Sequence, residues 1–417
     1  MIFTPYSDET QTINLIRKIR NEEYALIRMT YTMIDKNNLD ANGIFREMLE
    51  KNGLVDYEVL EFGGGNGISY NALFIQQGKA ESIKLKFYRV ANKRGDRRFS
   101  IETLKRRMQD KEINVGDLLY ISVFKDDIGT PQIFIINLTH NTPSAQEVLN
   151  AVGADSITQL FNEIKPKLQE IINGGFYDNY KGAGKIAPKD VGDTLEYLLG
   201  IKTNNRNDAD YKGLIEVKSK GGSRTLDTLF TLRPCFDGTP VALVEAKDRN
   251  RVSAFARLYG YDSEKHPGYN SLYITIGSKE APQNNQGFYL DTDEEEEKVN
   301  LVRIDPNNAN KKTIAAYWTF ADLKEQLYLK HPSTLWVKAK SRMVSGMGQF
   351  KYCEVEFSRA PQFMTFLSLI KAGIITYDWR GYTTKTGRYK GKNHGNAWRI
   401  KPSAKAYLFG EIEKVDL

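Results

Sequence analysis

Cysteine is scarce in this sequence, and long apolar runs are missing. The 417 residues include only two cysteines, Cys235 and Cys353. They form neither a CxxC pair nor a disulfide framework, so we expect no zinc site, no disulfide and a reducing compartment. No run of 18 apolar residues is present, which argues against a membrane-spanning helix. The first stretch, MIFTPYSDETQ, lacks the basic segment and apolar core of a signal peptide, so we expect a cytoplasmic protein with no membrane partner.

Positive charge is concentrated in two segments. The net charge is +7, but residues 84–111 contain eleven Lys or Arg against three Asp or Glu, and residues 371–405 contain nine against one. Each segment is therefore +8, and the rest of the chain is −9. Basic clusters rich in arginine and aromatic residues, on an otherwise acidic chain, indicate binding to a polyanion. We interpret them as nucleic-acid-binding surfaces rather than as ordinary solvated charge.

The length and the texture of the sequence indicate a multidomain protein with two domains, which we place at residues 1–150 and 151–417. The first begins with helical spacing over residues 8–52 and continues as short β-rich runs, with a helical insert over residues 100–111. We therefore predict a mostly β domain. The expected strands are residues 57–62, 71–75, 82–90, 117–124 and 131–139.

The second domain mixes helices with strands, which indicates an α/β or α+β fold. Helices are expected over residues 157–173, where Pro166 should bend or split the helix, and over residues 190–199. The expected strands are residues 213–219, 228–232, 241–247, 271–276 and 299–304.

The stretch YKGLIEVKSK, residues 211–220, carries charges on a short apolar strand. Side chains alternate along a strand, so Glu216 and Lys218 face away from the core residues Ile215 and Val217. Asp210 precedes the stretch. Two carboxylates hold a hard cation such as Mg²⁺ through oxygen ligands, and a nearby lysine orients or deprotonates water and offsets phosphate charge. The pattern therefore favours phosphodiester hydrolysis.

The same pattern occurs twice, which keeps two sites open. DGTPVALVEAK places Asp237 before an expected strand that carries Glu245 and Lys247 on one face. For either match, the ordinary explanation is a strand whose outer face is charged. A further acid, Glu196, lies at the edge of the apolar stripe of the helix over residues 190–199. Asp190 is expected as the N-cap of that helix.

A resemblance favours the first site. GDTLEYLLGIKTNNRNDADYKGLIEVKSKGGSRTLDTLFTLRP, residues 192–234, resembles the core block of the MvaI/BcnI family of type II restriction endonucleases, in which a TLE-LLGI helix precedes the catalytic strand and TLF follows it. The resemblance implies an α/β PD-(D/E)xK restriction-endonuclease-like, MutH-like domain. It also implies Mg²⁺, replaceable by Mn²⁺, held by Asp210 and Glu216.

Under this resemblance Asp210, Glu216, Lys218 and Glu196 are the catalytic residues. Glu245 and Lys247 then belong to a neighbouring strand. Ala209 stands where the family motif usually has proline, and Asp208 lies nearby, so Asp208 stays an alternative first acid.

Residues 363–401 combine an amphipathic helix, ended by Gly373, with two strands and a basic loop. Arginine reads guanine through a bidentate contact, although a phosphate clamp is equally compatible with this composition. The segment is similar to the recognition region of the same family. By position, the resemblance implies four DNA-binding residues: Asp378, Arg380, His394 and Arg399.

The resemblance also implies how such an enzyme works. The substrate is double-stranded DNA with a CCNGG-type site, for which our best prediction is CCWGG. The enzyme is a monomer of a prokaryotic cell that cuts one strand after the other, and it is functionally paired with a cognate DNA methyltransferase. Two alternatives remain: a MutH-like mismatch-repair nicking endonuclease, and a non-catalytic DNA-binding regulator.

The N-terminal domain contains a glycine-rich stretch at residues 61–75, which lacks the GK[ST] of a phosphate-binding loop, so we reject nucleotide binding. Together with a basic hairpin at residues 87–100, it resembles the two arms of the DNA-binding pseudobarrel of EcoRII-type restriction enzymes. This implies an effector domain that binds a second DNA copy, as in type IIE enzymes; a non-specific DNA anchor is the alternative. The expected DNA contacts are Asn66, Tyr70, Arg89, Lys93, Arg94, Arg97 and Arg98.

Overall fold

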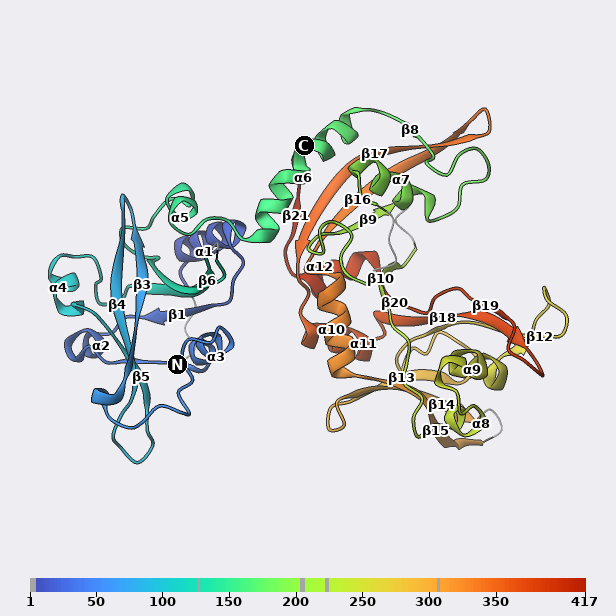
Figure 1. The fold of residues 1–417 in the computed structure, drawn as a ribbon, viewed down its shortest axis with the longest axis horizontal. Helices are drawn as coiled ribbons and strands as arrows, with labels where there is room; N and C mark the ends of the chain where they lie inside the picture. The colour runs from blue at the N-terminus through green and yellow to red at the C-terminus, as the bar shows by residue number, and fades with distance from the viewer. Residues whose placement is uncertain (1–4, 127, 203–206, 222–224, 306–307) are drawn as a thin grey trace. The chain divides into compact units, whose positions relative to one another are not determined.

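The chain folds into two compact units, Met1–Gln159 and Leu160–Leu417. The computed structural model describes residues 5–126, 128–202, 207–221, 225–305 and 308–417 (Figure 1). Within the described residues, no helix has both the length and the apolar character needed to cross a membrane.

Unit one is built on a seven-stranded sheet in the order β1-β6-β7-β3-β4-β5-β2. Neighbouring strands are antiparallel except for the parallel pair β3 and β7. The strands are β1 (Tyr24–Arg28), β2 (Leu39–Asp40), β3 (Ile68–Gln76), β4 (Lys79–Arg89), β5 (Arg97–Ile101), β6 (Leu118–Lys125) and β7 (Pro131–Asn137). The helices are α1 (Ser7–Ile19), α2 (Tyr31–Lys36), α3 (Gly43–Lys51), the 3₁₀ turn η1 (Gly64–Asn66), α4 (Leu104–Gln109) and α5 (Ala145–Val152).

Both faces of this sheet are buried. Along β6, Leu119 and Ile121 join one apolar cluster with Phe45 of α3, whereas Tyr120 joins a second cluster with Ile16 of α1. Alternate residues of a strand face opposite sides, so a continuous apolar run such as that of β6 indicates a strand covered on both faces.

Two expectations for unit one are wrong. Residues 8–52 are not one helical stretch, because β1 and β2 separate three helices and β1 pairs with β6. Residues 57–62 form no strand; the chain there is held by side-chain packing, and Tyr57 is buried with its hydroxyl donating to the carbonyl of Arg98 at 3.0 Å. The pseudobarrel remains a prediction.

Unit two contains three sheets. The first has the order β21-β17-β16-β9, with β8 on β17, and the second has the order β10-β20-β18-β12-β11, with β19 on β18. The third is β13-β14-β15. Among the described strands of the first sheet, β9 and β16 are the only parallel pair, so that sheet is mixed.

The bounds of the elements of unit two follow the chain. The strands are β8 (Tyr177–Asp178), β9 (Glu216–Lys220), β10 (Asp227–Thr231), β11 (Tyr261–Asp262), β12 (Tyr269–Ile276), β13 (Phe288–Asp293), β14 (Lys298–Asp305), β15 (Asn308–Thr319), β16 (Ser333–Val344), β17 (Met347–Arg359), β18 (Ile375–Thr384), β19 (Gly391–Asn393), β20 (Ala397–Ile400) and β21 (Ile412–Lys414). The helices are α6 (Ser156–Asn173), which begins in unit one, α7 (Asp190–Leu199), α8 (Pro240–Val244), η2 (Asp248–Asn250), α9 (Arg251–Tyr259), α10 (Phe320–Lys330), α11 (Phe363–Lys371), η3 (Pro402–Ala404) and α12 (Lys405–Phe409).

The helix expected over residues 157–173 forms as α6, which is continuous from Ser156 to Asn173, so Pro166 does not split it. A further expectation is wrong. Residues 241–247 form no strand, because α8 begins with Pro240, a residue suited to the first turn of a helix, and ends at Val244. A short apolar run does not distinguish a strand from a helix by its pattern.

His331 joins the first two sheets of unit two. It follows α10 directly and is fully buried; its Nε2 lies 2.9 Å from the carbonyl of Leu229 in β10, and its Nδ1 lies 2.8 Å from the hydroxyl of Thr334 in β16. Burial, together with the positive charge of Lys218, lowers the pKa of His331 from 6.5 to about 3. The neutral ring is therefore part of the folded state.

The depressed pKa predicts how the stability of unit two depends on pH. Below pH 6.5, His331 becomes protonated in the unfolded chain but stays neutral in the folded chain. The free energy of unfolding should therefore fall by up to about 1.4 kcal/mol per pH unit as the pH drops towards 3. Urea unfolding at pH 7 and pH 5, followed by fluorescence, measures this, because all four tryptophans lie in unit two. His331→Gln should flatten the slope, and the exposed His266→Gln should not. Equal slopes in all three proteins would contradict the assignment.

Candidate active site and DNA-binding surface

The carboxylate of Glu216 lies at the start of the parallel strand pair. Glu216 is the first residue of β9, and Thr334 of β16 lies opposite it. Ile215 and Val217 are buried in the core, as the alternation predicts, but Glu216 is also only 1% exposed. A buried carboxylate needs positive partners, so the side chains around Glu216 decide what this site can do.

Asp210 is folded back against this strand by a tight turn. The Tyr211 amide donates to the carbonyl of Ile215 at 2.8 Å, and the turn passes through Lys212 and Gly213, both with positive φ. An Asp210 carboxylate oxygen then accepts a hydrogen bond from the Val217 amide at 3.0 Å. Burial and the neighbouring Glu216 charge raise the pKa of Asp210.

Two lysines flank the paired carboxylates. Lys218 Nζ lies 2.5 Å from one oxygen of Glu216, and Lys330 Nζ lies 2.8 Å from the other. Lys330 also lies 3.2 Å from the carboxylate of Asp210. Burial opposes the charge of Lys330, but Glu216 and Asp210 more than offset this and raise its pKa. The structure thus brings Asp210, Glu216 and Lys218 together and adds Lys330, which the sequence pattern did not reveal.

Asp208 is less suited than Asp210 to be the first acid. Lys330 contacts Asp208 through the backbone carbonyl, at 3.2 Å, while the Asp208 carboxylate points towards Gly213. Asp210 contacts Lys330 and Val217 through its carboxylate. The geometry therefore favours Asp210.

Glu196 presents a third carboxylate from α7. The helix ends as predicted at Gly200, which adopts φ 76°, but it begins with Asp190 as its first residue and Lys189 at the N-cap, one position earlier than expected. Burial, reinforced by the charges of Asp210, Asp193 and Glu216, raises the pKa of Glu196 to about 7. Glu196 therefore exchanges a proton near neutral pH.

The donor set fits a hard divalent cation. Two carboxylates from separate segments already surround one positive group, the Lys330 ammonium, and oxygen ligands of this kind suit Mg²⁺ or Mn²⁺. Over the ranges that the structure describes, no three His, Cys, Asp or Glu side chains come together as one metal-binding group. The fit therefore rests on Asp210 and Glu216, with Glu196 nearby.

The second candidate site does not form. Residues 241–247 are helix and loop rather than a strand, so the prediction that Glu245 and Lys247 lie on a strand beside β9 is wrong. Lys247 is exposed, and Asp237 pairs with Arg251 at 2.6 Å. Arg251 also lies 3.5 Å from Asp248, so the carboxylates here pair with an arginine rather than with Lys247.

Three of the four predicted recognition residues form one network on the second sheet. Asp378 of β18 is only 1% exposed, and its carboxylate lies 2.8 Å from both Arg380 and Arg399. Thr275 of β12 donates its hydroxyl to the other Asp378 oxygen at 2.7 Å. Asp378 thus holds two partly exposed guanidinium groups side by side. Thr275 is a partner that the sequence pattern did not reveal.

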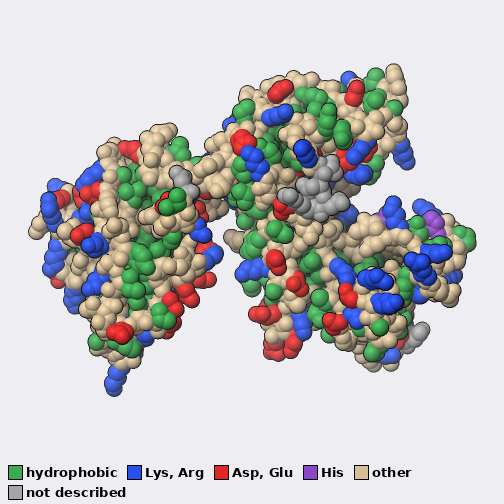
Figure 2. All heavy atoms as spheres, viewed as in Figure 1, with side chains coloured by type: hydrophobic (Ala, Val, Ile, Leu, Met, Phe, Trp, Pro, Cys, Tyr) green, Lys and Arg blue, Asp and Glu red, His purple; other side chains and the backbone are tan. Residues whose placement is uncertain are grey.

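His394 joins the same surface through its backbone and its ring. Its amide donates to the Arg380 carbonyl at 2.9 Å, and its ring centroid lies 5.9 Å from that of Tyr273. A pocket of about 590 Å³ opens here, lined by Tyr261, Ser263, Glu264, Lys265, His266, Ser271, Tyr273, Arg380 and His394. Lys and Arg side chains, with a histidine, gather on the lobe that carries β18 and β19, beside the hollow separating it from the lobe of α7 (Figure 2).

In unit one, the predicted hairpin forms from β4 and β5, but three of its arginines have internal partners. Arg97 lies 2.5 Å from Glu58, and Arg98 lies 2.6 Å from Asp40. Arg89 stacks on an aromatic ring, with its guanidinium carbon 4.3 Å from the ring centre of Phe62. These arginines therefore brace the hairpin.

The tip of this hairpin is more accessible. Lys93 and Arg94 are exposed, and no ion pair involves either of them within the described part of the chain. Of the glycine-rich segment, Asn66 is exposed and donates to the Phe62 carbonyl at 2.8 Å, whereas Tyr70 is half-buried and donates to the Leu54 carbonyl at 2.6 Å.

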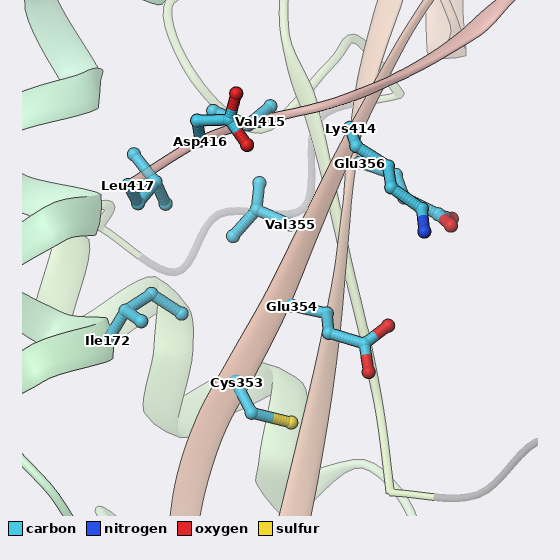
Figure 3. Close-up of a pocket in the computed structure, with 9 residues that line it drawn as sticks. All are labelled: Ile172, Cys353, Glu354, Val355, Glu356, Lys414, Val415, Asp416 and Leu417. Atoms are coloured by element: carbon cyan, nitrogen blue, oxygen red, sulfur yellow. The ribbon is translucent and has the colours of Figure 1, made fainter.

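A separate small cavity of about 190 Å³ contains none of these groups. It lies between α6 and the C-terminal strand, and is lined by Ile172, Cys353, Glu354, Val355, Glu356, Lys414, Val415, Asp416 and Leu417 (Figure 3). Two of the charges at its rim are paired, Glu354 with Lys338 at 2.6 Å and Glu356 with Lys405 at 3.3 Å. We assign it no chemistry.

Comparison with known proteins agrees with this geometry. The MvaI/BcnI restriction endonuclease family matches residues 165–409, more than half of the chain. A solved complex of restriction endonuclease MvaI with its cognate DNA substrate is 23% identical, covers 61% of this chain and 98% of its own, and superimposes with a TM-score of 0.51. MvaI in the absence of DNA is 21% identical, with coverages of 63% and 100% and a TM-score of 0.38. No curated protein matches the chain.

The family match covers α7, the Asp210 turn, β9 and the Asp378 network, which are the segments that carry the candidate site. The structural likeness supports a restriction-endonuclease-like fold with mixed sheets for unit two. The chain therefore belongs to the MvaI/BcnI restriction endonuclease family, whose members are hydrolases that cleave DNA at specific sites.

Proposed function

We propose that Asp210, Glu216, Lys218 and Glu196 form the hydrolytic site of this endonuclease. One observation carries the proposal: two carboxylates, from a turn and from a strand, converge on a single positive group. In the working enzyme we place a divalent ion, Mg²⁺ or Mn²⁺, on Asp210 and Glu216.

The site residues divide the hydrolysis of a phosphodiester among them. When bound, the divalent ion polarises the phosphate and makes a bound water more acidic. Lys218, held by Glu216, offsets the charge that develops on the phosphate as the water oxygen bonds to phosphorus and one P–O ester bond breaks. Glu196, with its pKa about 7, is suited to accept the proton that the water loses.

Site recognition is assigned to the Asp378 network. Arg380 and Arg399 are partly exposed and share one buried carboxylate, which fixes both guanidinium forks; such forks suit guanine O6 and N7. We assign His394 to the same surface. The proposed substrate is double-stranded DNA with a CCNGG-type site, best CCWGG, cut strand by strand by a monomer whose host carries the cognate methyltransferase.

Unit one is proposed to bind a second copy of the DNA as an effector, as a type IIE enzyme does. The exposed tip residues Lys93 and Arg94, with Asn66, are the residues best placed for phosphate contacts. Arg89, Arg97 and Arg98 contribute through the hairpin that they brace.

The catalytic assignment is tested by replacing Lys218. Lys218→Ala should lower plasmid cleavage by roughly 10²- to 10³-fold or more while leaving DNA binding intact, because it removes charge at the reacting phosphate. Lys247→Ala is the matched control, since its side chain is exposed outside the site. Cleavage by the purified wild-type chain alone also separates this function from a partner-dependent nickase. Loss of cleavage in Lys247→Ala, but not in Lys218→Ala, would show that the chemistry lies in residues 237–247 and that our assignment is wrong.

The recognition assignment predicts that a buried residue and a partly exposed residue lose discrimination alike when replaced. Arg380→Ala should cost roughly 1–3 kcal/mol of discrimination at one base pair. Asp378→Asn should cost at least as much, although Asp378 is buried, because both arginines lose their common anchor. Cleavage rates on substrates with single base changes measure this, with the surface variant Asp262→Asn as control. A rate that falls equally on every substrate would mean that the network only clamps phosphate.

The effector assignment predicts a salt-dependent defect. Replacing Lys93 and Arg94 by Ala should weaken DNA binding by the full chain and reduce the slope of log K against log salt by about 1–2, since each contact releases about one counterion. Lys105→Ala, which removes an exposed lysine paired with Asp35 on the same unit, is the control. An unchanged slope in the double variant, measured by fluorescence anisotropy, would remove the hairpin tip from the DNA-binding surface.

A further inference from the structure

The Lys330 ammonium is surrounded by oxygens of the proposed metal site. Its Nζ lies 2.8 Å from a Glu216 oxygen, 3.2 Å from an Asp210 oxygen and 3.2 Å from the backbone carbonyl of Asp208. The side chain is only 18% exposed. Three oxygens around one cation, contributed by the turn and by β9, form a coordination shell in which the ammonium takes the central place.

The backbone on both sides holds Lys330 in this position. Lys330 is the last residue of α10, where the carbonyl end of the helix favours a positive charge. The next residue, His331, is buried and bound to Leu229 and Thr334. Two residues later, β16 begins, and Ser333 donates its hydroxyl to the Leu214 carbonyl just before β9 at 2.7 Å. The flexible stem of the lysine is therefore the part that is free to move.

The two lysines at this site differ in what they contact. Lys218 contacts one oxygen of Glu216, whereas Lys330 bridges the other Glu216 oxygen and Asp210. A divalent ion placed on Asp210 and Glu216 would share these oxygens with the Lys330 ammonium. Like charges at such a distance repel strongly, and strongly buried ones most of all. Lys330 and the metal thus compete for one position.

We propose that Lys330 is a positioning residue that holds Asp210 and Glu216 together in the metal-free enzyme and is displaced by the divalent ion. The inference rests on the proposed metal site. It assigns Lys330 two opposite effects: it stabilises the carboxylate pair before the metal binds, and it weakens the affinity for the metal. A purely structural lysine would produce the first effect without the second.

The test measures metal binding without cleavage. Mn²⁺ is titrated into the full chain in the absence of DNA and followed by electron paramagnetic resonance and by thermal unfolding. Lys330→Met should bind Mn²⁺ about tenfold more tightly than the wild type, because a competing charge has been removed. Its metal-free Tm should fall, and Mn²⁺ should raise that Tm by more than in the wild type.

Two controls and a second variant complete the test. Lys330→Arg, which keeps the charge, and Lys338→Met, which removes an exposed lysine paired with Glu354, should keep wild-type affinity. Lys330→Gln, which is uncharged but still donates hydrogen bonds, should show the tighter binding if Lys330→Met does not fold. Folded Lys330→Met or Lys330→Gln protein with unchanged or weaker Mn²⁺ binding would overturn the inference.

Asp210→Asn separates this inference from the proposed function. One outcome is that Asp210→Asn loses Mn²⁺ binding while Lys330→Met and Lys330→Gln bind Mn²⁺ no more tightly than the wild type. That result supports the metal site but contradicts the role of Lys330. If Asp210→Asn binds Mn²⁺ as the wild type does, the metal site itself is wrong and the inference falls with it.

Discussion

The burial of the Glu216 carboxylate is the constraint on which the catalytic unit depends. A charge with 1% exposure is stable only if positive groups surround it, and here Lys218 and Lys330 do so from two different elements. The parallel pairing of β9 with β16 brings these elements together, and His331 fixes the end of α10 beside them. The fold and the site therefore depend on each other: the sheet positions the charged side chains, and their ion pairs stabilise the buried carboxylate in the sheet.

The same principle recurs at the proposed recognition surface. Asp378 is as deeply buried as Glu216 and also holds two positive side chains, but these face outwards rather than towards a reacting group. In the proposed function, one carboxylate of unit two organises the hydrolysis and another organises DNA recognition. In both cases the buried acid orients the cations around it, and we propose that these cations contact the DNA.

The sequence was most informative where local pattern decides structure. Alternation along residues 215–218 and the helical spacing of residues 190–199 predicted the faces of β9 and α7, and the family resemblance chose between two similar motifs. Contacts between residues distant in sequence could not be predicted. Lys330 lies 120 positions from Asp210, and the pairing of β9 with β16 is what brings the two together. The internal partners of Arg97 and Arg98 likewise depend on tertiary packing that no short window contains, whereas α8 has a local signal in Pro240.

A divalent ion on Asp210 and Glu216 is the central claim, and anomalous scattering from a Mn²⁺-soaked crystal of the full chain tests it most directly. The account predicts a peak between these two carboxylates, in the place that the Lys330 ammonium takes here, with Lys330 withdrawn. Mn²⁺ bound elsewhere in unit two, with both carboxylates still paired to Lys330, would contradict it.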